Sequence, residues 1–591
     1  MNAAMPVETL VTDHLDLWTA ALKRKSTAGR GSSSKVELYG IRKLRELILE
    51  LAVRGLLVPQ NRDDEPASEL LKRIAAEKAQ LVKEGKIKKE KSLSPVAEEE
   101  RPFRVPNTWA WERLGKVCQK LTDGSHNPPA DAGTGYAMLS SQNINYNKID
   151  FQNPSRFVSE DDFRKENQRT LIEPNDVLLN IVASIGRAAV VPADAPKFVL
   201  QRSVAVLKSG LAPQFLAKQL VAPSCLHYYE VHAKGTAQKG IYLGQLSQMP
   251  MVVPPLAEQH RIVAKVDELM ALCDQLEQET EASLGAHQTL VETLLSALTS
   301  AADHAQFASA WQRIAGHFDT LFTTEESIDQ LKQTILQLAV MGKLVPQNPN
   351  DEPASELLKK IAAEKAKLVR EGKIRKDKRL PEIAKTEAPF VLPDSWECVD
   401  LQTIAAVGTG ATPARDNNAY YHPQVFSWVT SGETSQQFVS ETREKISAKA
   451  VAETNVTIYP PGTLIIAMYG QGKTRGQITE LLIPAGTNQA CAAIQLIEPA
   501  SAHRSYIKVF FQKAYEDIRS LAEGGAQPNL NVGKISKTVL PLPPLSEQHR
   551  IVAKVDELMA LCDQLQSRLS DLQTTQLDLA DALTEKALAK A

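Results

Sequence analysis

The sequence lacks the features that would assign it to several common classes of protein. No apolar run reaches the ~18 residues that a membrane-spanning helix needs. The N-terminus carries an early glutamate and no basic stretch, so it does not have the pattern of a secretory signal. The six cysteines form no Cys-x-x-Cys pair, and none lies near a histidine at the spacing of metal ligands. We therefore expect a cytoplasmic protein without a metal site or membrane contact, in which Cys273 and Cys562 are buried free thiols.

The chain also lacks an excess of charge of either sign. It carries 68 lysines and arginines against 70 aspartates and glutamates, a net charge of −2. This balance argues against nonspecific coating of nucleic acid, which usually needs a basic excess. It leaves open a protein whose basic residues lie on one face, or one that binds DNA together with partner subunits. At 591 residues, the chain is long enough for several domains, each with its own core.

No catalytic pattern occurs in both halves of the chain. We find neither a repeated Ser/His/Asp arrangement nor a repeated pair of carboxylates. His260 and His549 occupy equivalent places in a repeated Glu-Gln-His-Arg stretch, so a structural or partner-facing role is favoured for them. This pattern favours binding over catalysis, although it leaves open a catalytic site confined to one half.

What the sequence does contain is a long-period duplication. Residues Leu51–Leu93 recur at Leu338–Leu380 with 33 of 43 positions identical. Residues Pro254–Leu276 recur at Pro543–Leu565 with 22 of 23 positions identical. A repeat of this length indicates two copies of one supersecondary frame.

Between the near-identical stretches lie two segments, 102–253 and 389–542, that have diverged from each other. Both are rich in glycine, proline, asparagine, threonine and β-branched residues, and short strand candidates such as 176–183 and 462–469 lie between turn signals. We expect each segment to form a compact mixed α/β domain of about 150 residues. The pattern favours one scaffold that carries two different recognition modules.

The repeated stretches have the spacing of helices that pack along a seam. Ile41, Leu44, Ile48 and Leu51 recur at intervals of three and four residues, as apolar positions of a coiled coil do. A longer seam predicts a helix from 257 to about 298, which would be ~60 Å long at 1.5 Å per residue. Because such a helix is not stable alone in water, it needs partners. The other long helix and the two short seams are the obvious ones.

The order of these seams predicts how the chain closes. The middle of the chain, 256–338, holds a long seam followed by a short one, and the two chain ends, 38–60 and 545–591, supply the equivalent pair. If the ends meet, the chain closes on itself about a pseudo-twofold axis. The two α/β domains would then lie at opposite ends of a helical spacer, in the symmetry of two half-sites on duplex DNA.

Several motifs resemble those of the specificity subunit of type I restriction-modification enzymes, in its variety with a longer N-terminal region. Each α/β segment opens with Pro-x-x-Trp, at Pro106–Trp109 and Pro393–Trp396, and each long helix starts with Pro-Pro-Leu-x-Glu-Gln. The resemblance covers about residues 38–591. Six stretches inside the α/β segments are similar to target recognition domains of that family: 123–129, 136–144, 176–191, 409–421, 463–476 and 488–494.

The resemblance implies a mixed α+β fold with a pseudo-twofold tandem repeat. Two α/β target recognition domains would be joined by long antiparallel coiled-coil helices. The predicted segments are a flexible N-terminal extension, a conserved helical region, the first recognition domain, a central helical spacer, the second recognition domain and a C-terminal helix. Their bounds are 1–35, 36–101, 102–253, 254–388, 389–542 and 543–591.

The resemblance also implies a division of labour among subunits. The chain itself would not be an enzyme and would hold no cofactor. Each recognition domain would read one half of a bipartite site on double-stranded DNA, with half-site centres about one helical turn, ~34 Å, apart. Two modification subunits that use S-adenosylmethionine to methylate adenine would dock on the helices. Restriction subunits, which are nuclease-translocases that use ATP and Mg²⁺, would join them for cleavage.

Three alternatives compete with this interpretation. The loop Ala467–Thr474 fits a loose phosphate-loop pattern and would suit an ATP-dependent enzyme, but a real phosphate loop needs a helix that starts at the phosphates. The stretch Asn127–Ala130 is similar to the Asn-Pro-Pro-aromatic motif of amino-methyltransferases, but alanine cannot stack on a flipped base. A coiled-coil scaffold without DNA contact is the third. If the 467–474 loop does not bind nucleotide, it would present basic side chains to DNA.

The DNA contacts are expected in the two divergent segments, because an asymmetric split site needs two different readers. Amide and guanidinium groups on loops are the best candidates, since asparagine and glutamine pair with adenine and arginine pairs with guanine. A structural role in the loop competes with base contact at every such position. By sequence alignment, Arg187 matches Arg475 and Gln238 matches Gln527. The candidates are Ser125, His126, Asn143, Ser184, Arg187 and Gln238 in the first segment, and Thr412, Tyr469, Lys473, Arg475, Asn488 and Gln527 in the second.

Overall fold

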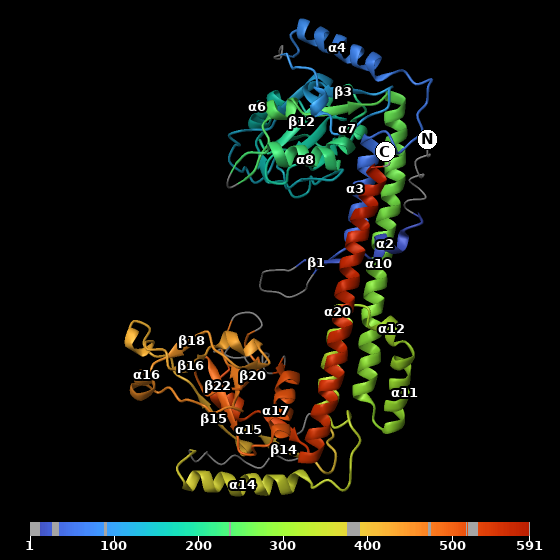
Figure 1. Cartoon of the computed structure of the whole chain (residues 1–591). Coiled ribbons are helices and arrows are strands. Elements are labelled where there is room, and N and C mark those ends of the chain that lie inside the picture. Colours follow the sequence, from blue (N-terminus) through green and yellow to red (C-terminus); the bar gives the residue numbers. More distant parts are fainter. Residues whose placement is uncertain are drawn as a thin grey trace. The chain divides into compact units, whose positions relative to one another are not determined.

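The structure, a computed structural model, describes most of the chain as two compact units (Figure 1). Unit 1 contains the described residues up to 283 together with the C-terminal stretch 572–589, and unit 2 contains residues 284–571. Each unit holds a short helix, a domain built on β-sheets, and parts of both long helices. The segment bounds given above stay predictions. The described residues are 12–25, 35–87, 92–235, 238–374, 390–470, 474–515, 517 and 530–589.

The helices and strands follow a similar order in both units. Those from the N-terminus through the first long helix are α2 (Leu15–Ala20), β1 (Lys23–Lys25), β2 (Lys35–Glu37), α3 (Tyr39–Val53), α4 (Ala67–Lys83), η1 (Glu98–Glu100), β3 (Ala110–Arg113), α5 (Leu114–Val117), β4 (Cys118–Asp123), β5 (Tyr136–Leu139), β6 (Ile144–Asn145), β7 (Lys148–Ile149), β8 (Arg156–Val158), α6 (Glu160–Thr170), β9 (Val177–Asn180), β10 (Ala188–Val190), β11 (Phe198–Leu200), β12 (Val204–Ser209), α7 (Pro213–Leu220), α8 (Pro223–His232), α9 (Leu243–Ser247), β13 (Pro250–Val253) and α10 (Leu256–Ser300).

The second series follows this order with some elements added, such as β17, and others missing, such as the hairpin of β6 and β7. Its members are α11 (His304–Gly316), α12 (Phe318–Leu321), α13 (Glu325–Val340), α14 (Ala354–Arg370), β14 (Glu397–Asp400), α15 (Leu401–Ile404), β15 (Ala405–Thr409), η3 (Asn418–Tyr420), β16 (Phe426–Val429), η4 (Ser431–Ser435), β17 (Phe438–Val439), β18 (Glu444–Ile446), α16 (Ala448–Glu453), β19 (Leu464–Ala467), β20 (Ile478–Leu481), β21 (Ala485–Thr487), β22 (Cys491–Leu496), α17 (Ser501–Lys513), α19 (Val532–Ser536), β23 (Val539–Leu542) and α20 (Leu545–Ala589).

Each unit contains a sheet domain, residues 110–253 in unit 1 and 397–542 in unit 2, and the two share a topology. The main sheet runs β10-β9-β12-β4 in the first and β15-β22-β19-β20-β17 in the second. A smaller sheet runs β11-β5-β8 or β18-β16-β21, and in both one pair of its strands is parallel. The first and last strands of each domain pair with each other, β3 with β13 and β14 with β23. The mixed α+β fold with a tandem repeat is therefore confirmed.

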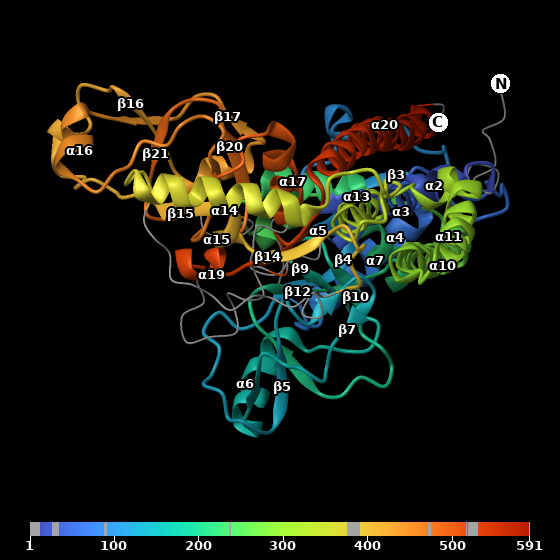
Figure 2. The ribbon, with the colours of Figure 1, turned by 90° about the horizontal axis from the view of Figure 1, so that it is seen from below.

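A helix on the outside of each sheet domain is fixed by the same interaction. In unit 1, the ammonium group of Lys78 on α4 donates to the carbonyl oxygen of Gly115 at 2.7 Å. In unit 2, the equivalent Lys365 on α14 donates to the carbonyl oxygen of Gln402. Figure 2 shows α14 beside α15, which Lys365 reaches. The inner faces of both helices are apolar, so burial already favours their contact with the sheet domain. The lysine hydrogen bonds fix the orientation of each helix in that contact.

The helical core of unit 1 brings the two ends of the chain together. Apolar side chains of α3, of the start of α10 and of the end of α20 share one buried cluster. Tyr39 near the N-terminus donates its hydroxyl hydrogen to Asp581 near the C-terminus at 2.8 Å, and Lys43 pairs with the same carboxylate at 3.0 Å. The predicted meeting of the chain ends is confirmed.

The helical core of unit 2 is formed by α13 together with the end of α10 and the start of α20. Val291 and Leu295 near the end of α10 share a buried cluster with Ile328 of α13 and with Ile551 and Val555 near the start of α20. Since the start of one long helix lies against the end of the other in each unit, α10 and α20 pair antiparallel, as predicted.

A buried glutamate joins each sheet domain to its long helix. In unit 1, Trp109 donates its indole N–H to Glu258 Oε2 at 2.9 Å, and Gln60 donates to the other carboxylate oxygen. One turn further along α10, Arg261 pairs with Asp64 at 2.6 Å. The repeated Pro-x-x-Trp and Glu-Gln-His-Arg stretches are therefore two sides of one junction.

Unit 2 has the same junction with the same geometry. Trp396 donates its indole N–H to Glu547 Oε2 at 2.9 Å, Gln347 donates to Oε1, and Arg550 pairs with Asp351 at 2.6 Å. Burial raises the pKa of Glu258 and of Glu547, although the hydrogen bonds from tryptophan and glutamine oppose this effect.

Two further findings concern the part of the chain that the structure describes. Within it, no helix is long and apolar enough to cross a membrane, and no group of three metal-ligating side chains forms. All six cysteines are buried and none forms a disulfide, so Cys273 and Cys562 are the buried thiols that the repeat predicts.

Candidate nucleic-acid interface

The loops that carry the predicted DNA contacts meet at one edge of each main sheet. Neighbouring strands β10, β9, β12 and β4 are antiparallel, so the ends of β4 and β9 lie beside the starts of β10 and β12. The same holds in unit 2 for the ends of β15 and β19 and the starts of β20 and β22. We call this edge, with the loops that leave it, the loop edge of each sheet domain.

Both loop edges begin with a glycine that passes close to a neighbouring loop. A Cβ atom on Gly124 would lie 2.2 Å from the carbonyl oxygen of Leu200, and one on Gly410 would lie 1.6 Å from that of Thr487. Any other residue would push the two loops apart, because real Cβ contacts are never this short. The glycine therefore sets the spacing of the loops in both units.

Ser125 and His126 follow this glycine in unit 1. Ser125 is buried, and its backbone N–H donates to the carbonyl oxygen of Leu200 at 2.7 Å. His126 projects further, with Nε2 at 2.8 Å from Asp123 Oδ2 and a half-exposed ring. Of the two, His126 is the one whose side chain can reach a ligand outside the loop.

Sequence reasoning missed Arg169, which lies in the last turn of α6 beside His126. Its Nε donates to the carbonyl oxygen of Asp123 at 2.9 Å, and its Nη2 pairs with the Asp123 carboxylate and lies 3.1 Å from His126 Nε2. The carboxylate of Asp123 is nearly buried while the arginine is half exposed. A buried carboxylate thus holds an exposed guanidinium in one orientation, an arrangement that suits phosphate or guanine contact. The buried Asp123 in Asp-Gly-Ser-His was the available signal, since a buried charge needs a partner.

Asn143 has a structural role in its loop. It is 2% exposed, and its Nδ2 donates to the carbonyl oxygens of Asp150 at 3.2 Å and Asn153 at 2.7 Å. Its Oδ1 accepts the backbone N–H of Ser140 at 3.0 Å. These bonds use the amide inside the protein, so they favour the structural alternative over base contact at this position.

The other three candidates of unit 1 also lie at the loop edge. Ser184 accepts a hydrogen bond from Asn180 Nδ2 at 3.0 Å, and Arg187 Nη1 donates to Asn145 Oδ1 at 2.9 Å. Gln238 is exposed on a loop that joins this edge through the bond from the Ala183 N–H to the Lys239 carbonyl, at 3.1 Å. The topology thus gathers all six candidates of the first segment.

In unit 2, the described candidates lie at the equivalent edge. Thr412 donates its backbone N–H to Gln489 Oε1 at 3.2 Å, and the Tyr469 N–H donates to the carbonyl oxygen of Ala490 at 3.3 Å. Asn488 Oδ1 accepts the N–H of Ala490 at 3.1 Å, so its side chain partly serves its own turn. Arg475 lies in the turn before β20. Lys473 and Gln527 lie outside the described residues.

The structure corrects one alignment between the two loop edges. The N–H of Asn180 donates to the carbonyl oxygen of Arg187 at 2.8 Å, and that of Ala467 donates to Gln477 at 2.9 Å, so these two pairs are equivalent. The prediction that Arg187 matches Arg475 is therefore wrong by two residues. The loops differ in length, and only the strand register reveals the pairing.

The phosphate-loop alternative fails on the same hairpin. The residues after Ala467 lead into β20, which runs antiparallel to β19, and not into a helix. A phosphate loop needs the N-terminus of a helix at the phosphates. The described part of this loop therefore does not have the structure that nucleotide binding would require.

A second preorganised arginine lies in unit 2 and was also missed. Arg415 pairs with Glu444 at 2.5 Å, and its guanidinium carbon lies 5.1 Å from the ring centres of Tyr421 and Trp428. The hydrogen bond that Arg415 donates to Glu444 raises the pKa of Arg415, which therefore stays charged. Aromatic rings hold this arginine as Asp123 holds Arg169 in unit 1.

Comparison with known proteins gives the family. A model described as "Type I restriction modification DNA specificity domain" matches residues 109–286 and 393–572. The specificity subunit of the type I restriction enzyme EcoAI from Escherichia coli is 40% identical over 618 residues, which cover 99% of this chain and all of that protein. The chain belongs to the family of type I restriction-modification specificity subunits. It is accordingly a DNA sequence-recognition subunit.

A second relative matches over the same extent of the chain, and a solved structure matches with lower similarity. The specificity subunit of the type I restriction enzyme EcoEI from Escherichia coli is 38% identical over 624 residues, covering 99% of this chain and all of that protein. The crystal structure of the HsdS subunit from Thermoanaerobacter tengcongensis covers 83% of this specificity subunit and 98% of that chain at 17% identity, with a TM-score of 0.40. The resemblance predicted from the tandem frame is confirmed.

Proposed function

We propose that each sheet domain of this specificity subunit binds one half of a bipartite site on double-stranded DNA with its loop edge. The observation that carries this proposal is the placement of the candidates. Candidates spread from Ser125 to Gln238 in the first segment, and described candidates spread from Thr412 to Asn488 in the second, come together at one equivalent edge. The sheets beneath are alike, whereas the side chains at the edge differ, as two readers of an asymmetric site require.

The long helices are proposed to set the gap between the half-sites. Both α10 and α20 contribute residues to unit 1 and to unit 2, so they connect the two sheet domains. Seven residues inserted into each helix keep the apolar seam in register and add ~10 Å of helix. The gap in the methylated site is then expected to grow by about three base pairs. An unchanged gap would contradict the role of the helices.

The chain is proposed to act without catalysis of its own, in the cytoplasm, together with other subunits. Two modification subunits would supply S-adenosylmethionine-dependent methylation of adenine, and restriction subunits would supply ATP- and Mg²⁺-dependent cleavage. The repeated start of the long helices supports two equal docking places. Its exposed residues are retained in both copies, including His260 and His549, and the leucines Leu272 and Leu561, which are 43% and 49% exposed.

Base-resolution methylation sequencing of cells that carry the complete system tests the division between the sheet domains. Arg187→Ala in unit 1 is expected to relax or abolish recognition at one half-site and leave the other unchanged. Its structural equivalent, Gln477→Ala in unit 2, is the matched variant and should affect only the other half. Loss of specificity in both halves from either variant would contradict separate readout. Methylation unaffected by every loop-edge variant would favour a scaffold without DNA contact.

A further inference from the structure

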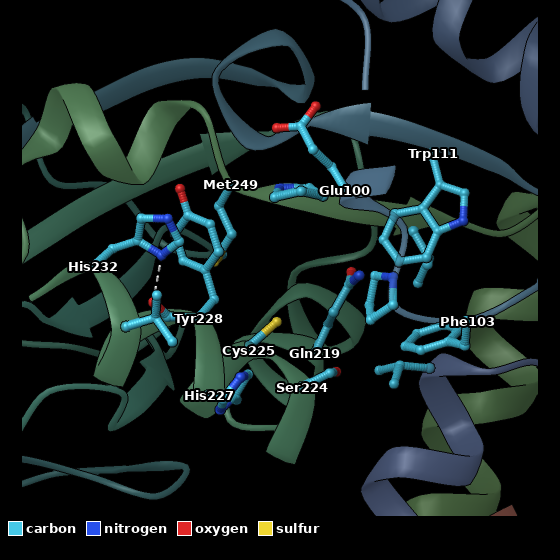
Figure 3. Close-up of a pocket in the computed structure, with 15 residues that line it drawn as sticks. Glu100, Phe103, Trp111, Gln219, Ser224, Cys225, His227, Tyr228, His232 and Met249 are labelled. Carbon is cyan, nitrogen blue, oxygen red and sulfur yellow. Dashed lines mark hydrogen bonds between the residues drawn. The ribbon is translucent and has the colours of Figure 1, made fainter. Parts of the chain in front are cut away.

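A pocket in unit 1 lies outside the loop edge and has no role in the proposed function. Its volume is about 220 Å³. Its walls come from α3, from the 100–103 stretch, from strands β3 and β13, and from helices α7 and α8. Figure 3 shows Trp111 and Phe103 on one side, Tyr228 and His232 on the other, and Gln219 and Cys225 between them.

The buried polar group of this pocket is Gln219. The residue is 3% exposed, and among the described residues its Oε1 has no hydrogen-bond partner. A buried carbonyl oxygen without a partner is destabilising, so such a group calls for an explanation, and a bound ligand would supply one. The side chain lies in the middle of the pocket lining in Figure 3.

The corresponding helix of unit 2 has no buried glutamine. Gln259 accepts the backbone N–H of Ala212 at the start of α7 at 2.8 Å, and its equivalent Gln548 lies 2.9 Å from the ring of His503 on α17, so α7 and α17 contact the same place on the long helices. The buried residues of α17 that follow His503 are mostly apolar or aromatic and include Phe510 of the apolar core. A buried glutamine is therefore not a requirement of the shared fold.

Most of the remaining lining is aromatic or apolar, and its other polar side chains are Glu100, Ser224, His227 and His232. Glu100 forms an ion pair with Arg113 at 2.6 Å, and the hydrogen bond from Arg113 lowers the pKa of Glu100. Burial raises the pKa of the Cys225 thiol, which is therefore neutral. The pocket thus suits a neutral ring, since its one carboxylate is already paired and most of its walls are aromatic or apolar.

We propose that this pocket binds a neutral aromatic ring of about the size of indole that carries one N–H or O–H donor, with Gln219 Oε1 accepting that hydrogen. The volume agrees with this class of ligand. A cavity of roughly 150 Å³ takes benzene, and indole has half as many heavy atoms again. The ring would lie between the Trp111 and Tyr228 sides, and its donor would satisfy the buried oxygen.

Titration of the full chain with matched ring compounds tests the hydrogen bond without any variant. Indole and benzofuran have the same size, but only indole has a donor, and 1-methylindole has its donor blocked. Calorimetry is expected to show indole binding about tenfold more tightly than benzofuran or 1-methylindole, the usual effect of one buried hydrogen bond. Equal affinity for the three, tighter binding of benzofuran, or no binding of indole would overturn the proposal.

Variants at Gln219 then assign the effect to this pocket. Gln219→Leu should remove the preference for indole over benzofuran, and Gln219→Phe, which fills the pocket with a larger ring, should abolish binding of both. Gln80→Leu on the exposed side of α4 is the control and should leave both affinities unchanged. A preference that survives Gln219→Leu in a chain with an unchanged thermal unfolding curve would overturn the assignment.

A second arm identifies the source of the ring. N-acetyltryptophanamide presents the same indole attached to a peptide backbone. If it binds with the same dependence on Gln219, the ligand is a tryptophan side chain of a protein partner. If only free indole binds, the ligand is a small molecule.

Discussion

The two sheet domains share a frame down to single hydrogen bonds, yet they differ in the groups that the frame leaves free. The junctions built on Glu258 and Glu547 have the same tryptophan and arginine contacts, at 2.9 Å and 2.6 Å in both units. In contrast, the repeated glutamine of the long helices contacts the backbone N–H of Ala212 in unit 1 and the buried ring of His503 in unit 2. The comparison teaches that shared junction contacts attach each sheet domain to its long helix, while the side chains of the loops and of α7 and α17 differ between the two units.

The largest effect is expected from removing the junction tryptophan. Trp109→Ala should destabilise unit 1, and Trp396→Ala should destabilise unit 2, each by about 3–5 kcal/mol, because a large buried ring is lost and a buried carboxylate loses a donor. Hydrogen exchange resolved by segment would measure the two units separately. Equal loss of protection in both units from one variant would contradict independent junctions.

A smaller effect is expected from the carboxylate that holds Arg169. Asp123→Asn should weaken binding at one half-site and destabilise the loop edge of unit 1 by about 1.5–3 kcal/mol, because a hydrogen bond between charged groups is lost. Binding to DNA with either half-site altered, together with urea unfolding, would measure both changes.

The matched variant for this prediction is Thr409→Val. Thr409 precedes the loop glycine of unit 2 as Asp123 does in unit 1, and its hydroxyl only donates to the carbonyl oxygen of Cys491 at 2.9 Å. Its effect on half-site recognition should be absent. If Asp123→Asn left recognition of both half-sites unchanged, Arg169 would have no part in reading DNA.

The difference at His503 predicts that the two units respond differently to acid. Burial lowers the pKa of His503, so the unfolded chain takes up a proton at a higher pH than the folded one. The stability of unit 2 is therefore full above the unfolded pKa of ~6.5 and falls as the pH drops toward the folded pKa, by at most about 1.4 kcal/mol per pH unit.

Segment-resolved hydrogen exchange between pH 7.5 and 5.5 would measure this effect in unit 2. Unit 1 serves as an internal reference, since its equivalent glutamine, Gln259, binds the backbone N–H of Ala212 and not a histidine ring. His503→Gln, which stays neutral and can still donate to Gln548, should flatten the difference between the units. A difference that persists in this variant would place its origin elsewhere.

The frame could be predicted from the sequence because its two copies are nearly identical and its seams have helical spacing. The spacing of Ile41, Leu44 and Ile48 predicted a buried helix face, and the order of the seams predicted that the chain ends meet, as the contact between Tyr39 and Asp581 shows. The family resemblance rested on the same repeats. These features are local or periodic, so one sequence is enough to reveal them.

The site was predicted less completely, because its residues come together only through the sheet. Arg169 lies 43 residues from His126 along the chain, and nothing in its own helix marks it as a partner of Asp123. Asn143 has the residue type of a base reader but uses its amide inside its loop. The mismatch between Arg187 and Arg475 arose because the loops differ in length, which only strand register resolves.

The most direct test of the central claim is methylation sequencing of a chimera. Residues 102–253 would be replaced by the equivalent segment of a relative with a different site, and the rest of the chain would stay unchanged. One half of the methylated site is expected to change to that of the donor while the other half and the gap are retained. A chimera that folds and methylates DNA with both halves changed, or with neither changed, would contradict the claim that each sheet domain reads its own half.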